Sequence, residues 1–209
     1  GTGSVAYGQD QQGRSARAGG YGYLVDDRGG GFDLGRQAVQ MALESQDGRR
    51  GPTQLWPLVC QALGAQEWSG LQAIIYRDLI EGRQRLAALA PLVGQAARAG
   101  DAAARSIVRS AGEALGDLAI GVARQLGLGQ ALQVYYSGAI YELGELLTTS
   151  LLARVSASYP LAELHPAQLD PLRGAVLLAL RAAGVSLSQE LLQALRQQTS
   201  PAESAGSDT

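Results

Sequence analysis

The first 35 residues are dense in glycine and show no helical spacing of apolar positions. Short runs at residues 4–7 and 15–18 lie between turn-forming residues. Such runs predict a β-hairpin, and the glycines that follow predict a loop. One further strand is predicted at residues 132–136, where apolar and aromatic residues precede Ser137 and Gly138.

From about Phe32 onward, the apolar residues recur with the spacing of one helix face. Thr53 and Asp101 are placed as N-caps, and Gly64 and Gly100 as helix ends. We expect helices at residues 32–47, 53–63, 83–99, 102–126, 141–156, 172–183 and 188–198, and leave residues 71–78 ambiguous. The tail from residue 199 predicts disorder. A few strands among many helices predict an α/β or α+β lobe, in which the hairpin and residues 132–136 share a small mixed sheet.

The composition excludes several classes of function but does not identify one. The 209 residues are 46% hydrophobic and 17% charged, enough to form a core, and the net charge of −2 argues against a nucleic-acid partner. All 17 basic residues are arginines, so a lysine nucleophile, Schiff base or P-loop lysine is excluded within this chain. No apolar run predicts a membrane span or a signal peptide, and we expect a cytoplasmic protein.

Cys60 and His165 are the only residues of their types. An internal disulfide, an all-cysteine metal site and a histidine-rich zinc site are therefore excluded within one chain. Cys60 lies on the apolar face of a short predicted helix, so we interpret it as a buried core residue. We place His165 in a loop before the last helices, without a catalytic role.

Three glycine-containing segments are candidates for ligand binding. The Gly-Thr-Gly-Ser run of residues 1–4 could bring backbone N–H groups close to phosphate oxygens, or could be an ordinary tight turn. Residues 19–31 place an aromatic residue between glycines and acidic residues soon after, an arrangement that suits a sugar but also a surface loop. The Ser137-Gly138 junction could bind an anion or be a plain turn between strand and helix.

In this order and at this spacing, the segments resemble the C-terminal half of the N-acetylglucosamine-kinase-like, BadF/BadG-type ATPases of the ribonuclease H-like actin/hexokinase superfold. The resemblance covers residues 1–184 and is most specific at residues 1–4, 19–35, 85–101 and 136–140. It implies an α/β fold with a small mixed sheet covered by helices. Residues 1–198 would form the C-terminal lobe of a two-lobe protein, followed by a disordered tail at 199–209.

The resemblance also implies a nucleotide site and a sugar site. Gly1, Thr2, Gly3 and Ser4 match the second phosphate loop of these kinases, with Thr2 and the amides of Gly1 and Gly3 directed at ATP. Ala87 matches a position on the adenosine side, and Gly138 with Ala139 matches the glycine of the adenosine motif. Gly20, Tyr21 and Gly22 match the segment that touches the amino sugar, and Asp27 matches the acid that binds sugar hydroxyls. ATP and Mg²⁺ are the implied cofactors.

This chain departs from the family pattern in the sugar loop. Arg28 stands where the family has glutamate, and Tyr21 where it has tryptophan. Because arginine only donates hydrogen bonds, Arg28 cannot replace the acid; it would either face solvent or recruit an anionic group. The family's first phosphate loop and catalytic aspartate belong to an N-terminal lobe that would precede Gly1.

The leading hypothesis is therefore one lobe of an ATP-dependent amino-sugar kinase, inactive without its other lobe. A degenerate kinase that acts as a sugar sensor or interaction protein is the alternative. An ATPase activator of a CoA-ester dehydratase or reductase is disfavoured, since its iron–sulfur cluster needs more thiolates than Cys60 supplies. The expected partners are a sugar and a nucleotide, with a homodimer left open.

Overall fold

The computed structural model describes residues 1–77, 79–186 and 188–197. It contains short strands and many helices, and its contacts divide the chain into two compact units. The first unit comprises residues 1–134 and 138–164, and the second comprises residues 135–137 and the part from His165 onward. The predicted tail at 199–209 lies outside the described residues. The extent of a single lobe over residues 1–198 stays a prediction.

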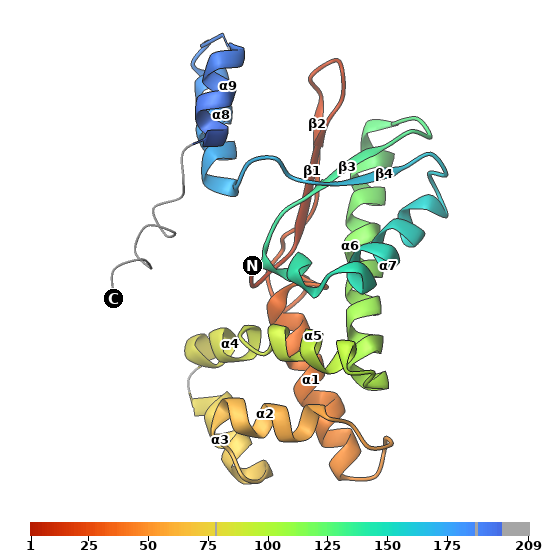
Figure 1. The fold of residues 1–209 in the computed structure, drawn as a ribbon, viewed down its shortest axis with the longest axis vertical. Coiled ribbons are helices and arrows are strands. Elements are labelled where there is room, and N and C mark those ends of the chain that lie inside the picture. Colours follow the sequence, from red (N-terminus) through yellow and green to blue (C-terminus); the bar gives the residue numbers. More distant parts are fainter. Residues whose placement is uncertain (78, 187, 198–209) are drawn as a thin grey trace. The chain divides into compact units, whose positions relative to one another are not determined.

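A β-hairpin opens the first unit, as predicted (Figure 1). Strands β1 (Val5–Gln9) and β2 (Ser15–Gly19) are antiparallel, with Tyr7 opposite Arg17. The hairpin packs on helix α6 (Ala102–Leu126) through its glycines: a Cβ at Gly8 would lie 2.6 Å from a Val122 methyl group. This close contact leaves no room for a larger residue.

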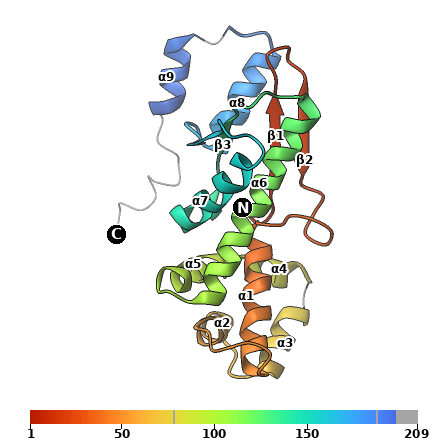
Figure 2. The ribbon, with the colours of Figure 1, turned by 90° about the vertical axis from the view of Figure 1, so that its right-hand side faces the viewer.

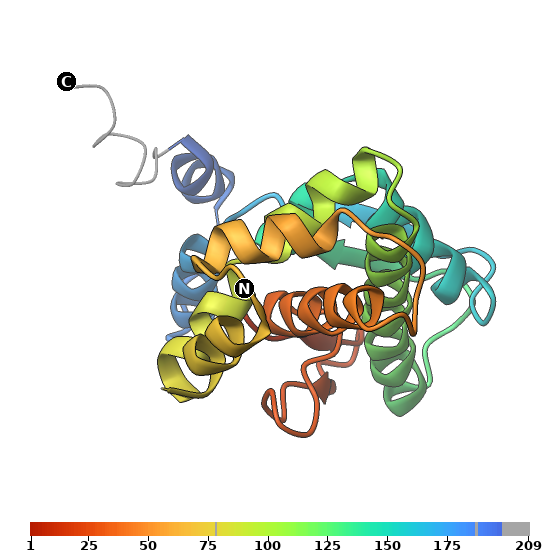
Figure 3. The same cartoon turned by 90° about the horizontal axis from the view of Figure 1, so that it is seen from below.

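Helix α1 (Gly31–Gln46) lies at the centre of the helical part of this unit, where α2 (Leu55–Leu63), α4 (Leu79–Ala87), α5 (Ala90–Arg98) and α6 contact it (Figure 3). Helix α3 (Trp68–Arg77), in the segment left ambiguous, packs on α4. The main core cluster is built from their apolar faces, with Leu34, Leu55, Leu89 and Ile107 nearly or fully inaccessible.

The cap predictions at Asp101 and Gly64 are confirmed. Asp101 Oδ1 accepts a hydrogen bond from Ala104 N at 2.9 Å at the start of α6. Gly64, in the left-handed conformation, ends α2. Thr53 Oγ1 accepts from Leu55 N at 3.1 Å, so it supports the first turn of α2, although the boundary residue is Gln54.

The prediction of a single helix at residues 83–99 is wrong. This segment lies in two helices, α4 and α5, which are separated by a break at Ala88 and Leu89. Pro91 explains the break: it has no N–H to donate, so it is favoured in the first turn of a new helix and disfavoured in a helix interior. The break turns the chain beside the N-terminal loop.

The helix expected at 141–156 also begins differently. A 3₁₀-helix, η1 (Ala139–Leu143), comes first, and α7 (Glu145–Ser156) follows after Gly144, whose φ of +81° interrupts the helix. Helix α7 packs closely on α6, where a Cβ at Gly112 would lie 2.5 Å from the Leu147 carbonyl oxygen. Figure 2 shows the two helices from the side.

Strand β3 (Gln133–Tyr136) confirms the second strand prediction, but it pairs with β4 (Glu163–Pro166) and not with the hairpin. The described strands thus form two separate two-stranded sheets. The prediction that the hairpin and residues 132–136 share one sheet is wrong. His165 lies in β4, not in a loop, and its ring packs against Tyr135 with centroids 5.3 Å apart. In the second unit, α8 (Pro171–Ala182) and α9 (Gln189–Gln197) lie where helices were expected.

Candidate nucleotide and sugar sites

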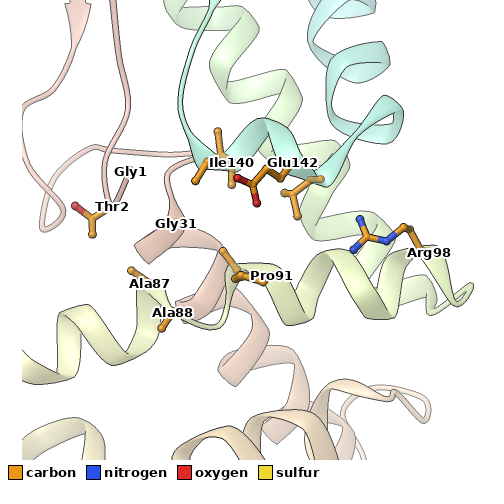
Figure 4. A pocket seen from close by; sticks show the side chains of 12 residues that line it. Gly1, Thr2, Gly31, Ala87, Ala88, Pro91, Arg98, Ile140 and Glu142 are labelled. Atoms are coloured by element: carbon orange, nitrogen blue, oxygen red, sulfur yellow. The ribbon is translucent and has the colours of Figure 1, made fainter. Parts of the chain in front are cut away.

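A cavity of about 330 Å³ opens in the first unit where three segments distant in sequence meet (Figure 4). Gly1 and Thr2 form one wall. The end of α4 and the start of α5 form a second wall, with Ala87, Ala88 and Pro91. Helix η1 closes the cavity with Ala139 and Ile140, among others.

The walls are mainly small apolar side chains. The charged residues that line the cavity, Arg98 and Glu142, do not lie at the Thr2 end. Arg98 lies at the opposite end of the cavity in Figure 4, and Glu142 projects from η1. A mainly apolar cavity with a few polar groups is the usual form of a small-molecule site.

The N-terminal loop is fixed to the start of α1 by backbone hydrogen bonds. Gly31 N donates to Gly1 O, and Phe32 N donates to Thr2 O, both at 3.1 Å. Gly30 allows this approach, since a Cβ there would lie 2.7 Å from the Thr2 carbonyl oxygen. The first-turn donors of α1 are therefore partly used to hold Thr2 in place.

Glycine is required at residue 138, whose φ of +120° is unfavourable for other residues. A Cβ at Gly138 would lie 3.5 Å from Gly1 N, so the junction after β3 lies beside the start of the chain. The structure thus brings Gly1, Thr2, Ala87 and Ala139 to one cavity, with Gly138 adjoining it.

Gly3 and Ser4 do not line this cavity. Ser4 is buried, and its hydroxyl donates to the carbonyl oxygen of Arg28 at 2.7 Å. Gly3 packs against Gly30 and Asp27. These two residues join the N-terminal loop to the glycine-rich loop.

The predicted sugar residues lie on the glycine-rich loop, and the structure does not bring them to the 330 Å³ cavity. Asp27 is 5% exposed and, among the residues that the structure describes, is alone outside glycine in having a positive φ (+60°). A Cβ at Gly3 would lie 2.5 Å from Asp27 Oδ2, so this carboxylate lies directly under the N-terminal loop. A constrained acidic residue in such a place is a common feature of ligand sites.

Tyr21 is exposed, and the guanidinium of Arg17 lies 5.6 Å from its ring centroid. Gly20 packs on Val5, and Gly22 is open. Neither these three residues nor Asp27 lines the 330 Å³ cavity. Arg28 is exposed, with no ion pair among the described residues, and lines a neighbouring hollow of about 430 Å³ together with Tyr23 and Arg36.

Arg83 was not anticipated from the sequence. Its Nη2 lies 3.3 Å from Thr2 Oγ1, and its guanidinium carbon lies 4.7 Å from the centroid of the Tyr23 ring. Helical spacing could have pointed to it, because Arg83 precedes Ala87 by four residues and so lies on the same face of α4.

Cys60 is buried, and burial raises the pKa of its thiol. A neutral, enclosed thiol is a poor metal ligand. Within residues 1–77, 79–186 and 188–197, no group of three or more His, Cys, Asp or Glu is placed to hold a metal ion. None of the helices in this part of the chain is long and apolar enough to cross a membrane.

The chain is similar in sequence to characterised kinases. The chain is 31% identical over 182 residues to N-acetyl-D-glucosamine kinase of Dictyostelium discoideum, an alignment that covers 86% of this chain and 57% of that protein. It is 36% identical over 115 residues to N-acetylmuramic acid/N-acetylglucosamine kinase of Clostridium acetobutylicum, covering 55% of this chain and 37% of that protein. The chain thus matches 57% of the length of the first of these relatives and 37% of the second.

Among solved structures, a putative N-acetylglucosamine kinase from Chromobacterium violaceum superposes with a TM-score of 0.66 at 30% identity, over 85% of this chain and 56% of that one. This neighbour identifies the fold as the actin/hexokinase type, in agreement with the prediction. A family model matches residues 1–179. The chain belongs to the BadF/BadG/BcrA/BcrD ATPase family.

Proposed function

We propose that this chain is the nucleotide- and sugar-binding lobe of an ATP-dependent amino-sugar kinase. The observation that carries the proposal is the shared cavity of Gly1, Thr2, Ala87 and Ala139. These residues come from three separate segments, and the family resemblance assigned all of them to the nucleotide. The relatives that act on N-acetylglucosamine support an amino sugar as the phosphoryl acceptor.

In this proposal, the apolar part of the cavity holds the adenosine and Thr2 lies toward the phosphates. A kinase gains most of its rate from positioning and from stabilising charge on the transferred phosphoryl group. Thr2 would donate its hydroxyl hydrogen to a phosphate oxygen. The apolar walls would exclude water, which strengthens such polar contacts.

Asp27 and Tyr21 would bind the sugar, Asp27 by accepting hydrogen bonds from ring hydroxyls and Tyr21 by packing against the ring. Gly20 and Gly22 would allow the sugar to approach the backbone. The catalytic aspartate and the first phosphate loop would come from a second lobe, so this chain by itself would bind ligands without turning them over. Mg²⁺ would enter with the ATP, since phosphate oxygens and water usually supply many of its ligands.

The test is calorimetric titration of ATP into the chain and into Ala139→Trp. Ala139 is exposed and lines the cavity, so an indole there should occupy the nucleotide space without disturbing the core. We expect an affinity at least about tenfold lower, because a blocked pocket loses apolar contacts of more than 1.4 kcal/mol. Ala153→Trp, at an exposed position of α7, is the matched control and should bind ATP normally.

A sugar sensor or interaction protein is the second candidate, and exposed Arg28 in place of an acid favours it. The two are separated by supplying a first lobe as a fusion and measuring phosphorylation of N-acetylglucosamine in a coupled assay. Turnover supports the kinase. Sugar binding without turnover, in a correctly folded fusion, supports the sensor.

A further inference from the structure

Arg83 does not itself line the cavity, but it contacts Thr2, which does, and it packs against the Tyr23 ring. Its Nη2 is within 3.3 Å of Thr2 Oγ1, and its side chain leaves α4 one turn before Ala87. Thr2 and Ala87 both line the cavity, as Figure 4 shows. The guanidinium is therefore held next to the site.

An aromatic pair supports the guanidinium from the other side. Its central carbon lies 4.7 Å from the centroid of the Tyr23 ring, and Tyr23 packs edge-on against Phe32 with centroids 5.0 Å apart. Arginine stacked on an aromatic ring is restricted in orientation, so less conformational entropy is lost when it binds a ligand. Its planar group is thus positioned in advance.

Donors of Arg83 remain unused in this arrangement. Arg83 Nε is buried without a hydrogen-bond partner, and the ion pairs seen among the described residues do not include Arg83. A buried donor without a partner is costly, and a ligand oxygen would relieve that cost.

The backbone N–H groups near Thr2 are not all available to bind a ligand oxygen. The N–H groups of Gly31 and Phe32, in the first turn of α1, already donate to Gly1 and Thr2. The chain has no lysine, so a permanently charged cationic side chain near Thr2 must be an arginine. Arg98, the arginine that lines the cavity, is at its other end.

We propose that Arg83 binds the phosphate groups of the nucleotide, and so sets which end of the cavity receives them. The inference rests on the proposed nucleotide site and its orientation, and adds a phosphate-binding residue to it. The guanidinium fork matches phosphate oxygens in geometry and charge.

The experiment measures the affinities of adenosine, ADP and ATP for the chain and for Arg83→Gln. A charge-assisted hydrogen bond to phosphate corresponds to about a 10- to 100-fold change in affinity. We therefore expect ADP and ATP to bind about 10- to 100-fold more weakly to Arg83→Gln, with adenosine changed by less than about twofold. Arg124→Gln, an exposed charge on α6, controls for the loss of one positive charge and should leave all three affinities unchanged.

A merely structural role gives a different pattern. If Arg83 only fixes the loop, Arg83→Gln should weaken adenosine and ATP equally. Tyr23→Leu keeps the guanidinium and removes its aromatic support; we expect a smaller loss, about three- to tenfold, again confined to ADP and ATP.

Three results would overturn the inference or its basis. Equal ATP affinity of Arg83→Gln and the unsubstituted chain refutes the role of Arg83 and leaves the nucleotide site standing. A phosphate-specific loss in Arg98→Gln instead of Arg83→Gln reverses the orientation. Failure of the unsubstituted chain to bind any of the three ligands refutes the proposed nucleotide site itself.

Discussion

Some residues of this chain are glycines because close packing leaves no room for a side chain, and others are candidates for contact with a ligand. Gly35 in α1 is the clearest packing case, since a Cβ there would lie 1.7 Å from the Leu86 carbonyl oxygen. Asp27 is the clearest binding candidate, because its backbone is held at positive φ and its carboxylate lies under Gly3. Both depend on contacts distant in sequence, so the predicted helix at residues 32–47 did not show the close contact of Gly35, and the pattern of the glycine-rich loop did not show the burial of Asp27.

Gly35→Ala should destabilise the chain by about 3 kcal/mol or more, because a backbone carbonyl cannot move aside as a side chain can. Urea unfolding measures the change. Gly51→Ala is the control, since Gly51 has open space and an ordinary φ, and it should differ from the unsubstituted chain by less than about 0.5 kcal/mol. Equal stability of the two variants would contradict the close packing of α1 against the end of α4.

Asp27→Asn should reduce sugar phosphorylation about 100-fold in a fusion that supplies the first lobe. Asparagine also tolerates positive φ, so the backbone is preserved while the charged acceptor is lost. A charged acceptor in a desolvated site contributes about 2–4 kcal/mol, which gives this factor in kcat/KM. Unchanged kcat/KM for N-acetylglucosamine, glucosamine and an acidic sugar would refute a sugar-binding role for Asp27.

Arg28→Glu, the reversal to the family's residue, distinguishes the two interpretations of Arg28 in the same fusion. If Arg28 is a solvent-facing charge, phosphorylation of N-acetylglucosamine should be maintained or improved. If Arg28 binds an anionic group, activity on an acidic sugar should be abolished, since the new carboxylate repels it. Kinetics with both sugars decide between these outcomes.

At the scale of elements, Asp101 joins two helices. Its carboxylate caps α6 through Ala104 N and also accepts from Gln54 N at 2.7 Å and from the Thr53 hydroxyl at 2.8 Å, next to α2. Burial alone would raise the pKa of Asp101, but these hydrogen bonds to its charged form outweigh burial and lower the pKa below its usual value. The cap was predictable from the sequence; the link to α2 was not.

Asp101→Asn should therefore cost about 1–2 kcal/mol of unfolding free energy at pH 7. Because the pKa is lower in the folded chain than in the unfolded chain, the stabilisation is complete above about pH 4 and is lost as the pH falls through the lowered folded value. Urea unfolding at pH 7 and pH 3 should show the difference between the two proteins shrinking at the lower pH.

Asp117→Asn provides the control for this prediction, since Asp117 forms an exposed ion pair with Arg154. Its effect should stay below about 1 kcal/mol at pH 7. A constant difference between Asp101→Asn and the unsubstituted chain from pH 7 to pH 3 would show that the Asp101 carboxylate does not act as inferred.

At the scale of the whole molecule, the hairpin and the predicted helices largely lie where periodicity and caps placed them. The breaks at Ala88 and Gly144 were missed, since helical spacing continues across both, although Pro91 was a visible signal. Strand β4 was missed because a four-residue segment has too little pattern to separate it from a loop. Motif order predicted that the residues of the proposed nucleotide site would meet, but which of them line the cavity depends on how the N-terminal loop, α4, α5 and η1 pack together.

The two units of the chain lead to a last prediction, about the contribution of α8 and α9. None of the residues of α8 is buried, and Leu172 and Leu178 are each more than 60% exposed. The core residues of the first unit precede this segment. A chain that ends after Gln168 keeps β4 and the hydrogen bond from Ala167 N to Tyr136 O.

This shortened chain should retain its unfolding free energy within about 1 kcal/mol, because little apolar area buried in the folded state is removed. Its ATP affinity should stay within about twofold, since every residue that lines the 330 Å³ cavity is present. Binding of a hydrophobic dye should fall, as the exposed leucines are gone. Urea unfolding, calorimetry and dye fluorescence measure the three quantities. A large loss of stability or of ATP binding would show that α8 supports the first unit and that the nucleotide site is not contained in residues 1–168.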